Sequence, residues 1–521
     1  MHLSHYWQVG KPVVKSRRGI VTAQNMTAAE AGANILGRGG NAVDAAVGTC
    51  LALAAVEPWM SGLGGGGFMV LYRAADRTVH AVDFSLISPR CLKTARYPLV
   101  TDFASDRDMF GWPQVVEDRN LYGYESICTP GTVDGLGLAL ERFGTMDWAD
   151  VLAPAIQLSE DGLALDWFAT LAFAHSAAEL KHDAVTRERI MPGGFPPAVS
   201  LAREPARLRF PELAQTLRRL AEAGPRDFYE GRLAAQVVAE IREGGGCLNA
   251  EDLKNYHAAV KKPLSFDYGN ATAHTVPGLS GGPTLAATLE SLNGRLGRTP
   301  EPGADAYQAY ARALQEAYRV RLADLGHAGL ETCTSHVNAV DNQGNMVTLT
   351  NTLLARFGSK VLLPRTGIFM NNGIMWFDPR PGRPNSLSPG VRPLANMCPT
   401  LLTRNGCGWV AMGAAGGRQI VPAVAQLVSF IVDYGFSLEA ALHQPRIDVS
   451  SPLGITCDFR LPAEVVAALS QVATVEPAQP TVFPVRFSVP SAVSRDAGSG
   501  WSHGQADPNQ PLSGAAEAGA A

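Results

Sequence analysis

The sequence predicts a layered α/β protein with a central pair of sheets. Three observations support this fold class. Helical patterns dominate the chain up to about residue 330, strand-like segments follow one another from residue 335, and glycine-rich loops border the strand-rich parts. With 46% hydrophobic residues among 521, the chain is also long and apolar enough to bury a large core.

The first unit, residues 19–72, begins with a strand-like GIVTA and continues with a helical pattern over residues 27–38. Asn41 is a good N-cap for a second helix, which Pro58 ends. A glycine cluster, GLGGGG, then comes immediately before a strand-like run. A dinucleotide-binding fingerprint needs its glycines after a strand and before a helix, so this order argues against a Rossmann fold.

Residues 148–330 are predicted to be mostly helical, and VNAVDNQGNMVTLTNTL then has the pattern of a hairpin around a turn at 341–344. The segments KVLL, TGIFMNN, CPTLLTR and GWVAMGAAG continue the strand pattern, and a helix is expected from Ile420 to about Tyr434. Residues 498–521 are rich in Gly, Ser and Ala, from which we expect a poorly ordered tail.

Composition and charge narrow the functional classes. The net charge is -4 and the pI about 6.3, and without a basic stripe the sequence argues against nucleic-acid binding and for a small-molecule substrate. The most apolar stretch, residues 42–56, contains Asp44 and is too short to span a bilayer, so we expect a buried helix there and no membrane segment. No signal-peptide pattern is seen at the N-terminus, so the expected location is cytoplasmic.

The eight cysteines are scattered, with no CxxC pair and no histidines at zinc-ligand spacing. We expect most of them to be reduced and to pack as small apolar residues. The cysteine pattern therefore predicts no metal site.

Several ordered motifs carry a resemblance to a known family. They are GGNAVDAAV, EP and GLGGGGFM near the N-terminus, TPGTVDG, ETCTSHVNAVDNQGNMVTLTNTL, and GAAGGRQI near the C-terminus. Together they resemble the γ-glutamyltransferase family over nearly the whole chain. The resemblance implies a four-layer αββα N-terminal-nucleophile fold, autoprocessed into a large subunit (1–333) and a small subunit (334–521) that form one intertwined domain.

The same resemblance assigns the reaction centre. In the family, the motif T-[TS]-H begins the small subunit, which makes Thr334 the nucleophile and the Cys333–Thr334 bond the site of autocleavage. A threonine hydroxyl is a weak nucleophile that needs an adjacent base, and a free α-amino group on the same residue can supply one. An internal threonine gains that amine only when the bond before it is cut.

By residue-by-residue carry-over, Thr352 resembles the second threonine of the family, whose hydroxyl bonds the nucleophile. Gly416 and Gly417 resemble the glycine pair whose N–H groups form the oxyanion hole. The alternative interpretation of the two glycines is a simple strand-to-helix turn. Nucleophile, base and oxyanion donors all come from the chain, so no cofactor is implied.

The substrate pocket departs from the family pattern. Ser85 stands where family members have the arginine that holds the α-carboxylate of the γ-glutamyl group, and Arg90, Lys93 or Arg96 could replace it from nearby. The other positions that normally grip the α-amino and α-carboxylate groups also differ, and they are Leu354, Gly373, Trp376, Ala395 and Asn396.

Other polar residues have structural interpretations beside functional ones. Arg356 and Arg392 flank the expected pocket and could meet an anionic substrate or form structural ion pairs. Asp433 and Asp448 fit a structural role. His336 fits a hydrogen-bonded structural role and a proton-transfer role equally well.

Three hypotheses follow. The first is a family enzyme that hydrolyses or transfers the acyl group of glutathione-like γ-glutamyl amides. The second is an acylase or amidase of the same family whose acyl group lacks the α-amino acid head. The third is an unprocessed, non-catalytic binding protein. The expected partners are a small-molecule amide and the two subunits of one precursor, with further dimerisation left open.

Overall fold

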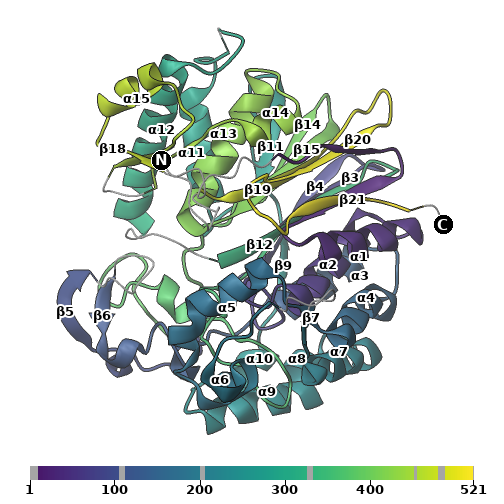
Figure 1. Cartoon of the computed structure of the whole chain (residues 1–521), viewed down its shortest axis with the longest axis vertical. Helices are drawn as coiled ribbons and strands as arrows, with labels where there is room; N and C mark the ends of the chain where they lie inside the picture. The colour runs from purple at the N-terminus through teal and green to yellow at the C-terminus, as the bar shows by residue number, and fades with distance from the viewer. Residues whose placement is uncertain are drawn as a thin grey trace.

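The computed structural model describes residues 10–104, 112–199, 206–297, 299–325, 333–450, 454–478 and 487–519. Two seven-stranded sheets, each antiparallel throughout, lie at its centre (Figure 1). The β15 sheet has the order β1 (Val14–Ser16), β20 (Ser502–Ala506), β19 (Val489–Arg495), β15 (Cys407–Ala415), β14 (Thr400–Arg404), β11 (Ala271–Thr275), β10 (Leu264–Tyr268). The β12 sheet has the order β21 (Gly514–Glu517), β2 (Gly19–Ala23), β12 (Cys333–Asp341), β13 (Met346–Leu354), β3 (Gly66–Arg73), β4 (Thr78–Phe84), β9 (Ala259–Lys261).

The two sheets pack against each other and carry helices on their other sides. Side chains alternate along β12, so Val337 and Ala339 lie on one face and His336 on the other. The first face packs on α1 (Met26–Gly37) and α2 (Ala42–Val56), and the second faces β15 and β19. On the β15 sheet, α11 (Gly282–Leu292) contacts β10, α13 (Ile420–Val432) contacts β15, and α12 (Ala304–Leu325) packs on α11. The result is a mixed α/β sandwich of antiparallel sheets.

The remaining elements surround this centre. Helices α5 to α10 gather at the end of the molecule away from α11 to α15 (Figure 1). The other helices are α3 (Thr132–Phe143), α4 (Trp148–Asp161), α5 (Trp167–Leu180), α6 (Ala184–Ile190), α7 (Pro211–Ala223), α8 (Asp227–Glu230), α9 (Arg232–Glu243), α10 (Ala250–Lys254), α14 (Leu438–His443) and α15 (Ala463–Ser470). Short strands outside the two sheets are β5 (Leu99–Ala104), β6 (Pro113–Val115), β7 (Leu163–Ala164), β8 (Arg207–Leu208), β16 (Ile447–Asp448), β17 (Ile455–Asp458) and β18 (Val475–Ala478).

Local sequence explains α2 and the β12–β13 hairpin. The Asn41 side chain accepts the N–H groups of Val43 and Asp44, and the Asp44 carboxylate accepts the Asn41 N–H, which forms a capping box. The helix ends before Pro58, as predicted. The predicted hairpin also forms, and the Asp341 carboxylate orders its turn by accepting backbone N–H groups of the turn.

The C-terminal segment corrects one expectation. We expected residues 498–521 to be poorly ordered, but the structure places residues 502–506 in β20 and residues 514–517 in β21, one strand in each central sheet. Its glycines serve close packing, because a Cβ on Gly504 would lie 2.4 Å from Ile20 Cγ2 and one on Gly514 would lie 2.2 Å from Met26 Sδ. Small residues therefore mark tight strand contacts here.

One further expectation needs correction, and another needs an addition. KVLL and TGIFMNN form isolated bridges, Leu362 with Phe369 and Met370 with Gly64, and no regular strand. The described part of residues 148–330 is mostly helical, as predicted, but it also contains β9, an edge strand of the β12 sheet, and β10 and β11, two strands of the β15 sheet. These strands are only three to five residues long and lie between helices, so their alternating pattern is too short to distinguish them in the sequence.

Among the described residues, no helix has both the length and the apolar character needed to cross a membrane. The same part of the chain holds no group of three or more His, Cys, Asp or Glu side chains that could bind a metal ion. The seven cysteines whose side chains the structure describes are free thiols. Both central sheets contain strands from before and after Thr334, so the two segments on either side of it are interleaved.

Candidate active site

Thr334 lies at the start of β12, where the pairing with β13 is irregular. Cys333 pairs with Leu354 and Ser335 with Asn351, so one residue of β12 stands opposite two of β13. This bulge brings the two predicted hydroxyls together, because Thr334 Oγ1 donates to Thr352 Oγ1 at 3.3 Å. Both threonines are buried.

The backbone after Thr352 is held in an unusual conformation. Leu354 has φ +84, a left-handed value that a branched side chain rarely adopts, and its N–H donates to Thr352 Oγ1 at 2.8 Å. Asn372 stabilises this turn, because its N–H donates to Leu353 O and its Oδ1 accepts the Ala355 N–H. The Thr352 hydroxyl is therefore fixed between the nucleophile candidate and a backbone donor.

The glycine pair follows β15 and precedes α13. Gly416 and Gly417 have φ values of +134 and +57, and a Cβ on Gly416 would lie 2.8 Å from Ser488 Cα. Three residues earlier, a Cβ on Gly413 would lie 2.2 Å from the His336 ring. This end of β15 thus approaches β12 closely, two residues from Thr334, and the geometry requires glycine.

His336 has a structural environment. Its Nδ1 lies 2.9 Å from Thr350 Oγ1 and its Nε2 lies 3.0 Å from Asn338 Oδ1. The amide oxygen can only accept, so Nε2 carries the proton and Nδ1 accepts from the Thr350 hydroxyl. Burial lowers the pKa of His336 to about 4. Of the two roles considered, the neutral, hydrogen-bonded one fits the structure.

Contacts in the structure link several of the predicted pocket positions in pairs. A Cβ on Gly373 would touch Leu86, the residue after Ser85, at 2.6 Å. The side chain of Asn385 connects two other positions, because it donates to Trp376 O at 2.6 Å and accepts the N–H of Leu394, the residue before Ala395. Leu354, Trp376 and Ala395 are all buried. This part of the site is therefore mainly apolar.

Arg392 places a positive charge next to Ser85, the position where family members have an arginine. Its Nη1 donates to Ser85 Oγ at 2.8 Å and to Ser85 O at 2.6 Å. The replacements considered from the sequence do not take this place, because Arg90, Lys93 and Arg96 are exposed and Arg96 pairs with Glu125 at 2.9 Å.

The Arg392 site carries a net positive charge. The carboxylate of Asp83 accepts from Lys261 Nζ at 2.6 Å and lies 3.4 Å from Arg392 Nη1. These two cations and the Ser85 hydrogen bonds hold the pKa of Asp83 below its usual value despite its burial. One negative charge therefore faces two positive charges beside Ser85.

Arg321 is a buried cation that the sequence pattern did not reveal. Its guanidinium donates to Asn396 Oδ1 at 2.9 Å, to Ala395 O at 2.7 Å and to Ser280 O at 2.9 Å. Burial lowers the pKa of Arg321. It lies within a helical pattern of α12, so no local signal separates it from a surface arginine.

The two aspartates have structural partners. Asp433 accepts from the hydroxyls of Tyr268 and Ser429 at 2.5 and 2.6 Å. Asp448 accepts from Gln419 Nε2 at 3.2 Å, in the turn that follows the glycine pair. Both sets of contacts agree with the structural role expected from the sequence.

Comparisons with known proteins identify the family. A family model described as Gamma-glutamyltranspeptidase matches residues 28–331 and 327–517. The chain belongs to the gamma-glutamyltranspeptidase family. A relative named Glutathione hydrolase proenzyme, from Escherichia coli (strain K12), is 30% identical over 83% of this chain and 81% of its own length. Another, named Acylase ACY 1 proenzyme, from Pseudomonas sp. (strain V22), is 31% identical over 84% and 83%.

Solved structures show the same fold. Cephalosporin acylase from Bacillus halodurans has a TM-score of 0.85 at 24% identity and covers 98% of both chains. The gamma-glutamyltranspeptidase of Helicobacter pylori has a TM-score of 0.51 at 27% identity over 58% of this chain and 82% of its own. The relatives are therefore named for two different activities, glutathione hydrolase and acylase, and similarity at about 30% identity does not choose between them.

Proposed function

We propose that this chain is a precursor that cleaves itself between Cys333 and Thr334 and then acts as an N-terminal-nucleophile amidohydrolase. The observation that supports it is the pairing of the Thr334 and Thr352 hydroxyls at the β12–β13 bulge. Membership of the family, whose relatives are named proenzymes, supports the same conclusion. The mature protein would be a four-layer αββα sandwich of two interleaved subunits, 1–333 and 334–521.

Self-cleavage uses only groups of the chain and water. In the precursor, Thr334 Oγ1 attacks the Cys333 carbonyl carbon, the bond to the Thr334 nitrogen breaks, and that nitrogen takes the hydroxyl proton. Water then hydrolyses the resulting ester. The new α-amino group serves as the base when Thr334 Oγ1 attacks a substrate amide, and water or an amine releases the acyl group from Thr334. The Gly416 and Gly417 N–H groups would stabilise the oxyanion.

For the acyl group, we favour a dicarboxylic acid monoamide without an α-amino group. Leu354, Trp376 and Ala395 offer no side-chain acceptor for an ammonium group. Beside Ser85, two cations face the single carboxylate of Asp83, which favours an acyl group that bears a carboxylate. The relative named as an acylase supports this choice.

A γ-glutamyl donor such as glutathione is the second candidate, because relatives at similar identity are named glutathione hydrolases. The two candidates differ in one group, the α-amino group of the donor. They share the carboxylate that Arg392 would meet. A non-catalytic, unprocessed protein is the third alternative.

Three p-nitroanilides separate these alternatives. The glutaryl anilide lacks only the α-amino group of the γ-glutamyl anilide, and the butyryl anilide lacks the carboxylate as well. We expect the purified protein to hydrolyse the glutaryl compound fastest, and Arg392→Gln to slow it with little effect on the butyryl compound. Faster release from the γ-glutamyl compound would select the second candidate. Thr334→Ala is the control, and this variant should stay whole on a denaturing gel and release no nitroaniline.

A further inference from the structure

The turn after α2, residues 57–61, holds the start of β12 through side chains. Ser61 Oγ donates to Ser335 Oγ at 2.9 Å, and Ser335 Oγ donates to Glu57 Oε2 at 3.3 Å. All three side chains are buried. Ser335 is the residue directly after Thr334, so this chain of hydroxyls and carboxyl fixes the strand next to the nucleophile.

The same turn holds the partner strand through its backbone. The Leu353 N–H donates to Met60 O at 3.1 Å, and the Phe357 N–H donates to Trp59 O at 2.9 Å. Leu353 directly follows Thr352. The 57–61 turn therefore binds the neighbours of both threonines, one on each strand of the hairpin.

Glu57 is an uncommon residue at such a position. Its side chain is fully buried, and its Oε1 has no hydrogen-bond partner among the described residues. Burial raises the pKa of Glu57 to about 8, while the Ser335 hydrogen bond and the Arg356 charge lower it and Asp166 raises it further. Burial therefore favours the neutral, protonated form of this carboxyl.

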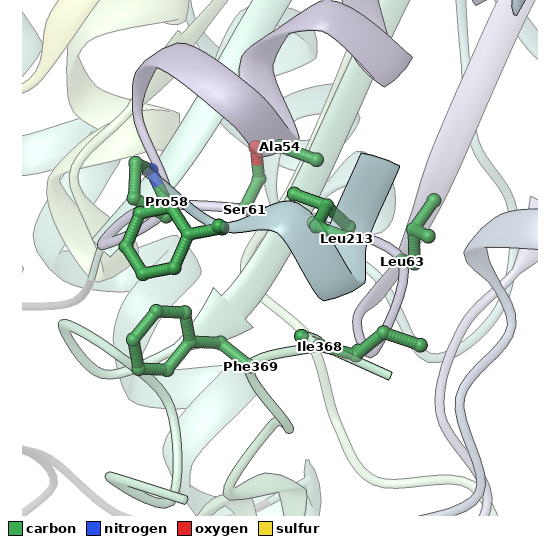
Figure 2. Close-up of a pocket in the computed structure, with 10 residues that line it drawn as sticks. Ala54, Pro58, Ser61, Leu63, Leu213, Ile368 and Phe369 are labelled. Carbon is green, nitrogen blue, oxygen red and sulfur yellow. The ribbon is translucent and has the colours of Figure 1, made fainter. Parts of the chain in front are cut away.

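The space next to this turn does not admit a substrate. Figure 2 shows the hollow lined by Pro58 and Ser61 on one side and by Ile368 and Phe369 on the other. Its volume is about 10 Å³, which leaves room for at most a single water molecule. The hollow therefore offers no space for a substrate beside Ser61, and Glu57 contacts β12 through its hydrogen bond with Ser335.

We propose that Glu57 is a positioning residue that acts through Ser335 to hold the Thr334 hydroxyl opposite Thr352. The inference rests on the proposed function, because it requires Thr334 to be the nucleophile. The need for such a residue grows after cleavage, since Thr334 then becomes a chain end, and chain ends are mobile unless other contacts hold them. Ser335 directly follows the new chain end, and its side chain binds that end to the turn after α2 through Ser61 and Glu57.

The test measures self-cleavage of freshly folded precursor on a denaturing gel for Glu57→Ala, Glu57→Gln, Ser335→Ala and the double variant Glu57→Ala/Ser335→Ala. Glu57→Ala should slow cleavage roughly 10²-fold, the scale of a misplaced reacting group. Glu57→Gln should restore most of the rate, because a neutral amide keeps an acceptor oxygen for Ser335. The double variant should be no slower than the slower single variant, because each single substitution already removes the same Glu57–Ser335 hydrogen bond.

Asp44→Asn is the matched control, because Asp44 is another buried acid, in the first turn of α2 at the end away from Glu57, where it accepts from Thr145. It should lower thermal stability without slowing cleavage per folded molecule. Equal slowing by Asp44→Asn and Glu57→Ala, or additive effects of Glu57→Ala and Ser335→Ala, would overturn the positioning role alone. A wild-type chain that never cleaves would overturn the proposed function together with it.

Discussion

Replacing Thr352 with valine tests the central contact of the site most directly. Valine keeps the β-branched shape and nearly the volume of threonine but has no hydroxyl. In the structure this hydroxyl accepts from Thr334 Oγ1 at 3.3 Å and from the Leu354 N–H at 2.8 Å. Thr352→Val therefore removes both of these hydrogen bonds in a fully buried place without leaving a cavity.

The two lost hydrogen bonds predict two separate effects. The Leu354 N–H loses its acceptor on Thr352, and an unpaired buried N–H costs about 1–3 kcal/mol of folding stability. The Thr334 hydroxyl loses a neutral hydrogen bond, which contributes about 0.5–1.5 kcal/mol. If this amount is added to the barrier to attack, the reaction slows by roughly 2- to 13-fold.

Self-cleavage is the appropriate assay, because it needs no knowledge of the substrate. Precursor that has just been refolded is sampled over time on a denaturing gel, and its urea-unfolding midpoint is measured in parallel. Thr352→Ser, which keeps the hydroxyl, should cleave at nearly the wild-type rate. If Thr352→Val loses stability but cleaves as fast as the wild type, the Thr352 hydroxyl does not assist Thr334 and this reasoning is refuted.

Two further predictions concern folding. The pKa of His336 is lowered by burial to about 4, against about 6.5 in the unfolded chain. As the pH falls, the unfolded chain therefore binds a proton before the folded protein does. The free energy of unfolding should fall by about 3 kcal/mol between pH 6.5 and 4. Urea unfolding from pH 7 to 4 should show a shallower decline for His336→Gln, and identical slopes would contradict the assignment. Ending the chain at Ala497 removes β20 and β21 and leaves buried Arg446 without Asp507, its partner at 2.9 Å. This truncation should give insoluble protein, whereas a chain ending at Gly519 should stay folded, as solubility and circular dichroism will show.

Much of the site could be predicted from the sequence because its residues are close together along the chain. Thr334 and Thr352 sit on two strands joined by a tight turn, and a hairpin fixes which residues of its strands face each other. The turn sequence at Asp341 and the alternating apolar residues specify that hairpin locally. The caps of α2 are likewise local signals, and they predicted its boundaries correctly.

The C-terminal tail shows where composition misleads. Gly, Ser and Ala are typical of disordered segments, but they also allow backbones to approach closely. At Gly504 and Gly514 the neighbouring side chains leave no room for a Cβ. Only the packing of β20 and β21 against other strands distinguishes the two cases, and that packing involves residues almost 500 positions earlier in the chain.

The sequence by itself determined the nucleophile candidate, the hairpin that carries it and the loss of the usual arginine at Ser85. Tertiary structure decided which groups surround them. Arg392 reaches Ser85 from a loop 307 residues away, and Glu57 reaches Ser335 across 278 residues. Such contacts depend on how layers pack and not on spacing along the chain, so no periodic pattern records them. The physical reason is that burial and charge pairing are properties of the folded surroundings of a residue, whereas turns and caps are properties of its neighbours in sequence.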